Sequence, residues 1–243
     1  MKSEIQSHIA AMGKGHDNVL EMKGALRTEN TILTVTEFAK GGELNEVVDK
    51  VRKSGIPEDS KMLLKLVMTK DAVQGLQFMQ TEQNMSHYDV KPKNFFVGEG
   101  GVTKLSDFGR AGFGHNVESK QSTPAYTPPE ARDKPSEKID TFAMGISLDE
   151  VLNDVNYEDD SVRFVRKDDT SINKLISAMT SDKPEDRPTL TAVLQHSVFS
   201  NPVLNDKGIQ DKAHELINAI IEGNQDDIIR LNTELSQLVK AVK

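Results

Sequence analysis

The sequence predicts an α+β fold in which a short strand-containing part is followed by a larger, mostly helical part and a C-terminal helical hairpin. Two β-rich runs occur early, at residues 21–26 and 31–38. Apolar residues recur at helical spacing over residues 57–85 and again after residue 201. Between these helical stretches lies a polar stretch at residues 87–109 that interrupts the pattern. The charged residues that point most clearly to a function lie there.

Length and composition limit the possible function classes. The chain has 243 residues, 36% of them hydrophobic, so it is long enough to bury a sizeable core. A net charge of −8 without a Lys/Arg cluster argues against a nucleic-acid or anionic-membrane partner. Without cysteine, neither a disulfide framework nor a thiolate metal site can form. The first residues lack the apolar run of a signal peptide and no window predicts a membrane span, so we expect a protein of a reducing cytoplasm.

The amino-terminal residues predict one helix and one hairpin. Ile5, Ile9 and Met12 recur at helical spacing, and the glycines within residues 13–15 end that helix. The two β-rich runs that follow are separated by the polar residues 27–30, which favours an antiparallel hairpin.

The rest of the chain predicts helices. Residues 57–85 form one long apolar stripe, which is typical of a core helix leading into the polar stretch. Apolar residues continue over residues 146–152, which favours a further helix there. After residue 201 two amphipathic helices are separated by Gly223-Asn224, with Asn224 as a helix cap. Such a hairpin most often packs on its own domain; the alternatives are a docking or dimerisation element and the start of a further helical domain.

The polar stretch contains the residue types that phosphoryl transfer requires. It reads His87-Tyr88-Asp89-Val90-Lys91-Pro92-Lys93-Asn94, continues through a predicted strand–turn–strand, and ends in Ser106-Asp107-Phe108-Gly109. Carboxylates, an amide and an ammonium on the two sides of a hairpin can hold magnesium-bound phosphates beside a hydroxyl group. Magnesium prefers such oxygen ligands because it is a small, hard cation.

These two segments resemble the catalytic loop (H-R-D-L-x-x-x-N) and the metal-binding loop (D-F-G) of eukaryotic-type serine/threonine protein kinases. We call residues 87–94 the catalytic loop and residues 106–109 the metal loop. The resemblance implies that Asp89 accepts or orients the substrate hydroxyl and that Lys91 neutralises charge on the transferred group. It also implies that Asn94 and Asp107 ligate magnesium, with ATP as phosphoryl donor and a protein as substrate. Structural roles are implied for His87, Phe108 and Gly109, with the His87 side chain packing against Phe108.

The same resemblance implies a two-lobed fold. Residues 1–39 would be a partial upper lobe, residues 40–200 the lower lobe, and residues 201–243 a helical extension outside the kinase pattern. Residues 140–152 would form a helix of the lower lobe, and residues 172–179 and 189–199 would be the two helices that close it. The run from Thr36 to Leu44 resembles the hinge between the lobes, where backbone groups bind adenine. Glu43 would face the ribose or a basic substrate residue, or it is simply a carboxylate in the first turn of a helix. The implied nucleotide-contacting residues are Thr36, Glu37, Phe38, Ala39, Glu43, Phe96 and Asp107.

Another part of the resemblance concerns the platform on which a protein substrate would bind. Residues 122–130, Ser-Thr-Pro-Ala-Tyr-Thr-Pro-Pro-Glu, are similar to the kinase segment that ends in A-P-E. This implies that Thr123 contacts the catalytic residues, that Glu130 pairs with Arg187, and that Asp140 anchors the backbone of the catalytic loop. A buried carboxylate requires a partner, and a guanidinium offers a bidentate one.

The sequence departs from the family pattern in two respects. Tyr88 replaces the arginine that binds an activation-loop phosphate, so we expect activity that does not depend on that phosphorylation. No G-x-G-x-x-G-x-V loop and no V-A-I-K strand occurs, which predicts an incomplete upper lobe, through natural truncation or because the chain is a fragment. Glu4 is the candidate for the helix glutamate that normally pairs with the missing lysine; the alternative is a solvated first-turn glutamate. These features resemble kinases that bacterial pathogens inject, which would place the protein in a host cytoplasm.

Three functions are compatible with the amino-acid sequence. A serine/threonine protein kinase accounts for Asp89, Lys91, Asn94 and Asp107. A catalytically impaired pseudokinase or binding module accounts for the missing phosphate loop and strand lysine, without which we expect the chain as given to be at best weakly active. A small-molecule phosphotransferase shares the catalytic aspartate and asparagine, but it would not be expected to contain the segment ending at Glu130.

Overall fold

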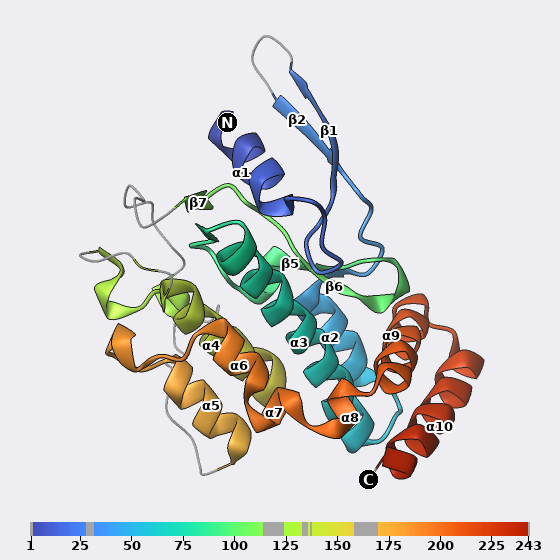
Figure 1. Cartoon of the computed structure of the whole chain (residues 1–243). Helices are drawn as coiled ribbons and strands as arrows, with labels where there is room; N and C mark the ends of the chain where they lie inside the picture. Colours follow the sequence, from blue (N-terminus) through green and yellow to red (C-terminus); the bar gives the residue numbers. More distant parts are fainter. Residues whose placement is uncertain are drawn as a thin grey trace.

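One long helix, α3 (Glu58–Glu82), runs through the centre of the helical part of the molecule (Figure 1). The computed structural model describes residues 2–27, 32–113, 124–132, 136, 138–157 and 170–242. Around α3 lie the helices α2 (Leu44–Lys53), α4 (Lys138–Asn153), α5 (Ser171–Met179), α6 (Leu190–Gln195), α7 (Ser197–Ser200), α8 (Pro202–Asn205) and α9 (Lys207–Glu222). The remaining α-helices among the described residues are α1 (Lys2–Met12) and α10 (Gln225–Val242). The strands are short: β1 (Met22–Arg27), β2 (Ile32–Thr36), β3 (Gly42–Glu43), β4 (Met85–Ser86), β5 (Phe95–Val97), β6 (Thr103–Leu105) and β7 (Gly112–Phe113). This confirms the predicted α+β class.

Helix α3 is the core element because its apolar stripe is completely buried. Leu64, Met68, Ala72 and Leu76, each four residues after the last, have no exposed surface, as i, i+4 spacing on one helix face requires. The helix contacts α4, α6, α8, α9 and β6. It ends earlier than the predicted residue 85, because Asn84 adopts a positive φ of 51° and turns the chain into β4.

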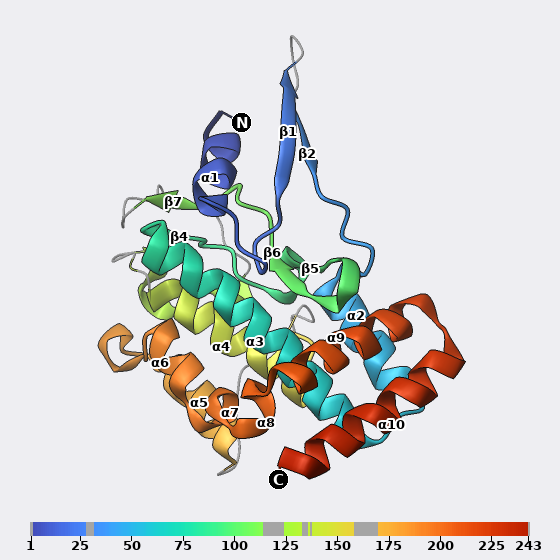
Figure 2. The same cartoon turned by 45° about the vertical axis from the view of Figure 1, so that its right-hand side comes forward.

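Strands β1 and β2 form the predicted antiparallel hairpin, and Leu26 lies opposite Leu33. The turn between them lies outside the described residues. In both side views the hairpin lies beside α1 and extends away from the other helices (Figures 1 and 2). Leu26 and Leu33 are exposed there. This hairpin is therefore much less buried than the helical part.

A second small sheet, in the order β3-β5-β6, places the two polar loops. Phe95 pairs with Leu105, so the residue before β5 and the residue after β6 lie at the same end of this hairpin. The hairpin is joined to the chain between α1 and β1 by a parallel bridge between Val19 and Leu105. Asn18 strengthens this junction, because its side-chain amide donates to the Thr103 carbonyl at 3.0 Å.

The predicted single helix at residues 189–199 is wrong: the segment forms α6 and α7. His196 interrupts it with an extended backbone (φ −64°, ψ 146°), and its Nδ1 accepts a hydrogen bond from the Val198 N–H at 3.3 Å. The side chain thus caps a new helix, which satisfies a donor that would otherwise lack a partner.

None of the described helices combines the length and the apolar composition that a membrane span would require.

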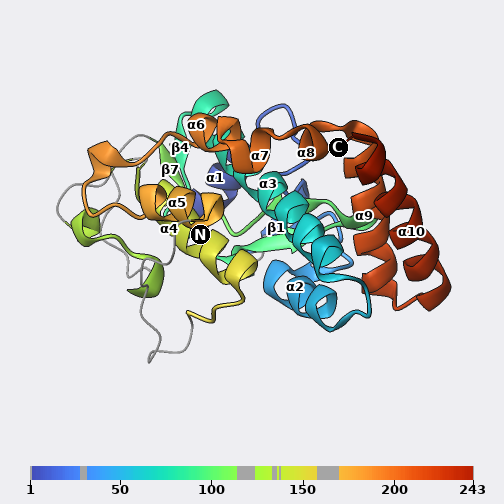
Figure 3. The ribbon, with the colours of Figure 1, turned by 90° about the horizontal axis from the view of Figure 1, so that it is seen from below.

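The two predicted C-terminal helices are present as α9 and α10, and they pack on the rest of the chain. Gly223 ends α9 with a positive φ of 71°, and the Asn224 side chain accepts from the Asp227 N–H at 3.3 Å. Helix α9 lies between α10 and the helices α2 and α3, as the view from below shows (Figure 3). It also contacts the β5–β6 turn so closely that a Cβ on Gly101 would lie 2.2 Å from the His214 carbonyl oxygen.

A largely buried contact between His214 and Asp71 joins α9 to the core and predicts a pH-dependent stability. His214 Nε2 lies 2.9 Å from Asp71 Oδ2, and the same oxygen accepts from the Thr103 N–H at 3.1 Å. Burial lowers the pKa of His214, but the hydrogen bond to Asp71 and the charges of Asp71 and Asp211 outweigh it, so the pKa lies above its ordinary 6.5. Because the folded pKa is the higher one, the stabilisation is complete below pH 6.5 and is lost as the pH rises through the folded pKa.

We therefore expect His214→Gln to lower the urea midpoint of unfolding more at about pH 5.5 than at about pH 8.5. His16 and His214 line one cavity between α9 and the core. Wild type and His214→Gln both contain His16, so its titration contributes equally to the stability of both and cancels in the difference between them. Asp71→Asn is the control, since it removes the charge that raises the pKa and should weaken the pH dependence. A difference between wild type and His214→Gln that stays constant with pH would contradict this prediction.

Candidate active site

The catalytic loop is held in place by a buried carboxylate at the start of α4. Asp140 has no exposed surface. It accepts hydrogen bonds from the backbone N–H groups of His87 at 2.7 Å and Tyr88 at 2.8 Å. Tyr88 has a positive φ of 62°, which is unfavourable for a non-glycine residue, so the loop needs this anchor. Burial raises the pKa of Asp140, while the N–H donors from His87 and Tyr88 favour the ionised form.

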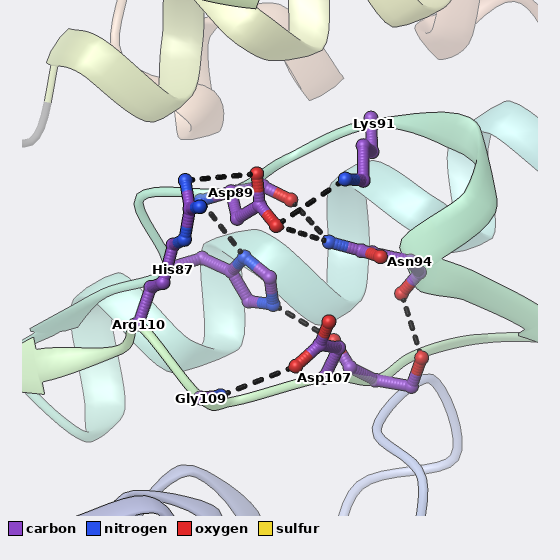
Figure 4. Close-up of polar contacts among 8 residues, drawn as sticks. His87, Asp89, Lys91, Asn94, Asp107, Gly109 and Arg110 are labelled. Atoms are coloured by element: carbon purple, nitrogen blue, oxygen red, sulfur yellow. Dashed lines mark hydrogen bonds and ion pairs between the residues drawn. The ribbon is translucent and has the colours of Figure 1, made fainter. Parts of the chain in front are cut away.

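Three residues of the catalytic loop form one contact group around Asp89 (Figure 4). The Asn94 side-chain amide donates to the Asp89 backbone carbonyl at 2.6 Å and to its carboxylate Oδ2 at 3.0 Å. Lys91 Nζ lies 3.4 Å from the same Oδ2. The geometry therefore brings together a carboxylate, an ammonium and an amide.

The metal loop is bonded directly to the catalytic loop. The Asn94 carbonyl accepts from both the N–H and the hydroxyl of Ser106, each at 2.9 Å. His87 Nε2 lies 2.8 Å from the Ser106 carbonyl. Asp107 follows immediately, with a positive φ of 56° and an exposed side chain, and its Oδ1 accepts from the Gly109 N–H at 3.3 Å. The chain thus holds Asn94 and Asp107 at neighbouring positions at one end of the β5–β6 hairpin.

The donor set of these two residues fits magnesium. Because the Asn94 amide nitrogen is used on Asp89, its oxygen remains available as a ligand. Asp107 forms no ion pair with any residue that the structure describes, so its carboxylate is also available. No described group of three His, Cys, Asp or Glu side chains could hold a metal by itself. Magnesium does not need such a cage, since it commonly binds one or two protein ligands together with phosphates and water.

A column of side chains connects α1 to both loops and to α4. The Phe108 ring centre lies 4.5 Å from that of His8 in α1 and 5.7 Å from that of His87, which it meets edge-on. The backbone of His87 is in turn bonded to Asp140. The expected contact between His87 and Phe108 is therefore present. Sequence reasoning missed His8, although its position one helical turn after Glu4 was an available signal.

The residues expected at the hinge occupy the connection between β2 and α2. Thr36 ends β2. Glu37 continues the pairing, because its N–H donates to the Glu21 carbonyl at 2.9 Å. Its side chain lies 3.0 Å from Lys104 Nζ in β6, which ties the hinge to the lower sheet. Phe38 is 83% exposed. The Ala39 carbonyl accepts from the Gly42 N–H at 3.1 Å, forming the turn into β3.

Two further nucleotide-contact candidates lie opposite each other on paired strands. Glu43 in β3 pairs with Phe96 in β5. Phe96 is half-buried, and its other cross-strand neighbour is Lys104. Glu43 also occupies the N-cap position of α2, but its side chain forms no capping hydrogen bond. Glu43 therefore lies at the start of a helix, as the alternative of a first-turn carboxylate expects, and its role towards a nucleotide stays a prediction.

The expected ion pair between Glu130 and Arg187 is present and nearly buried. Arg187 donates to both carboxylate oxygens, at 2.5 and 2.9 Å. The Arg187 side chain has no exposed surface, and that of Glu130 is 13% exposed. The same guanidinium donates to the carbonyls of Ser181 and Lys138 and stacks 4.9 Å above the Phe142 ring centre. This arrangement joins the end of the expected substrate platform to α4.

Two of the expected residues have no described side chain, and one unexpected residue lies beside the site. Thr123 lies outside the described residues. Glu4 lies in α1, but its side chain is not among those described. Arg110 was not predicted as a site residue, yet its NH1 lies 3.5 Å from Asp89 Oδ1 (Figure 4). Its place directly after the metal loop was the signal that could have identified it.

Comparison with known proteins gives a consistent result. The family model described as "Protein kinase domain" matches residues 1–199. The chain is 28% identical to an Aurora kinase of Dictyostelium discoideum, over 79% of this chain and 52% of that protein. It is 26% identical to the CBL-interacting serine/threonine-protein kinase 7 of Arabidopsis thaliana, over 100% of this chain and 62% of the relative. It is also 26% identical to the serine/threonine-protein kinase TIO of the same plant, over 85% of this chain but only 16% of that protein. The chain thus spans less than two thirds of the length of these relatives.

Proposed function

Because the chain belongs to the protein kinase domain family, we propose that it transfers the γ-phosphoryl group of magnesium-bound ATP to serine or threonine hydroxyls of protein substrates. The observation that carries this proposal is the contact group of Asp89, Lys91 and Asn94, bonded through the backbone to the loop that contains Asp107. Positioning and charge stabilisation account for most of the catalysis in such transfers, so a preformed group of this kind is what the reaction needs.

Each residue of the group has a defined role in this proposal. Asp89 orients the substrate hydroxyl and accepts its proton as the oxygen bonds to the γ-phosphorus and the bond to ADP breaks. Lys91 offsets the negative charge on the transferred group. Asn94 and Asp107 would hold magnesium, which when bound neutralises charge on the β- and γ-phosphates. Thr36, Glu37, Phe38, Ala39, Glu43 and Phe96 would surround the adenine and ribose.

Two observations favour a hydroxyl of a protein as the acceptor. Lys91 follows Asp89 by two positions, which resembles serine/threonine kinases, and two of the relatives above are named as such. The Glu130–Arg187 pair supports the segment that would bind a polypeptide, which a small-molecule phosphotransferase would not need.

Since Tyr88 cannot bind a phosphate as an arginine does, the proposed activity does not depend on activation-loop phosphorylation.

The test is transfer of labelled γ-phosphate from ATP to a generic basic protein, followed by identification of the modified residues. We expect label on serine and threonine, and its complete loss when EDTA removes magnesium. Binding of ATP without any transfer would contradict the proposal and favour the binding module. Label on tyrosine only, or transfer that survives EDTA, would contradict the substrate class or the metal requirement respectively.

A further inference from the structure

Arg110 is a charged residue beside the catalytic loop that has no role in the reaction as described above. Its guanidinium NH1 lies 3.5 Å from Asp89 Oδ1, at the limit of hydrogen-bond distance. The Arg110 side chain is 30% exposed and that of Asp89 is 10% exposed. At this separation and partial burial, two opposite charges still attract each other appreciably.

The backbone around Arg110 is held on both sides, so its side chain starts from a defined position. On one side the Ala111 N–H donates to the Phe108 carbonyl at 3.1 Å. On the other, β7 pairs with β4, with Gly112 opposite Ser86. The Ser7 hydroxyl of α1 donates to the Ala111 carbonyl at 2.9 Å. Three elements therefore fix the chain from which Arg110 reaches Asp89.

The two oxygens of Asp89 are held from opposite sides. Oδ2 receives the Asn94 amide and faces Lys91, whereas Oδ1 faces Arg110 (Figure 4). Without Arg110, no side chain that the structure describes would hold the carboxylate from the Oδ1 side. The residue before Asp89 cannot supply a cation in its place, because Tyr88 has no positive charge.

We propose that Arg110 is a positioning residue for Asp89: it links the segment after the metal loop to the catalytic carboxylate and keeps that carboxylate in the orientation that receives the substrate hydroxyl. This inference rests on the proposed function, since it assigns Arg110 a part in the same reaction. It predicts an effect on the chemical step and little effect on substrate binding, because Arg110 contacts the catalytic loop and is not among the expected nucleotide-contacting residues.

Three substitutions separate charge from packing. Arg110→Met keeps most of the side-chain stem without the charge, and we expect it to lower kcat by about tenfold while KM for ATP and peptide changes little. Arg110→Ala should have a similar effect. Arg110→Lys should retain most of the activity, since a single contact can be made by a point charge, unlike a bidentate one. Arg230→Met, at an exposed arginine of α10, is the matched control and should leave kcat unchanged.

A second measurement tests the contact without relying on activity. The urea midpoints of Arg110→Met, Asp89→Asn and the double variant form a double-mutant cycle, and we expect the two single effects to be non-additive. An additive cycle would overturn the assignment even in an inactive protein. A kcat that is unchanged or higher in Arg110→Met would also overturn it, a rise indicating an inhibitory contact. If the wild-type protein shows no transfer, the proposed function fails, whereas a non-additive cycle would still show that Arg110 holds Asp89.

Discussion

Replacing Asp89 by asparagine is expected to lower kcat for phosphoryl transfer by about 100- to 10,000-fold, the range typical for loss of a general base. The asparagine side chain has nearly the same shape, and its oxygen can still accept the hydrogen bond that Asn94 donates at 3.0 Å. It cannot take up the hydroxyl proton, and it loses the charge that faces Lys91 and Arg110. The loop should therefore keep its structure while the chemistry is lost. Initial rates at saturating magnesium-ATP are the measurement.

A matched control for this substitution is Asp59→Asn. Asp59 lies exposed in the first turn of α3, outside the candidate site, so its charge should not affect transfer. We expect wild-type rates for Asp59→Asn and an unchanged urea midpoint within a small margin. If Asp89→Asn transferred phosphate as fast as Asp59→Asn, Asp89 would not be the proton acceptor, and the proposed mechanism would have to be abandoned.

Replacing Arg187 by alanine is expected to lower the free energy of unfolding by about 3–5 kcal/mol, because it leaves a nearly buried carboxylate without its partner. Glu130 would lose two charge-assisted hydrogen bonds at 2.5 and 2.9 Å. The Ser181 and Lys138 carbonyls would lose a donor, and the Phe142 ring would lose the stacked guanidinium. Urea denaturation followed by far-UV circular dichroism measures the loss.

Two further variants show whether the loss comes from the buried charge. Arg230→Ala breaks exposed ion pairs with Asp227 and Glu234 in α10, and it should change the urea midpoint far less. Adding Glu130→Ala to Arg187→Ala should restore part of the lost stability, since the unpaired carboxylate is then gone. A midpoint for Arg187→Ala that equals that of Arg230→Ala would show that the pair contributes little.

The sequence predicted those parts of the fold that depend on neighbouring residues. The apolar stripe of α3, the hairpin of β1 and β2, and the break at Gly223 between α9 and α10 all follow from local spacing and backbone preference. The predicted end of α3 and the predicted single helix at residues 189–199 were wrong, because each depends on a feature that the apolar pattern does not contain. Asn84 takes a left-handed conformation at the end of α3, and the His196 ring caps a new helix where the apolar pattern continues.

Sequence patterns likewise predicted only part of the candidate site. The order and spacing of Asp89, Lys91, Asn94 and Asp107 are enough to indicate phosphoryl transfer, and the individual roles of these residues remain predictions. Glu130 and Arg187 were expected to pair only through a family resemblance, because no local rule connects residues so far apart. Arg110 and His8 were missed, since their neighbours come from other segments of the chain.

Taken alone, the amino-acid order determined the long helices, the hairpin of β1 and β2, and the set of polar residues that one site could contain. The tertiary structure decided which of them touch: Arg110 beside Asp89, His8 on Phe108, and His214 on Asp71. The reason is physical. Periodicity and capping act between residues within a few positions of each other, whereas these contacts depend on how separate helices and strands pack, which the buried surfaces of the whole chain determine together.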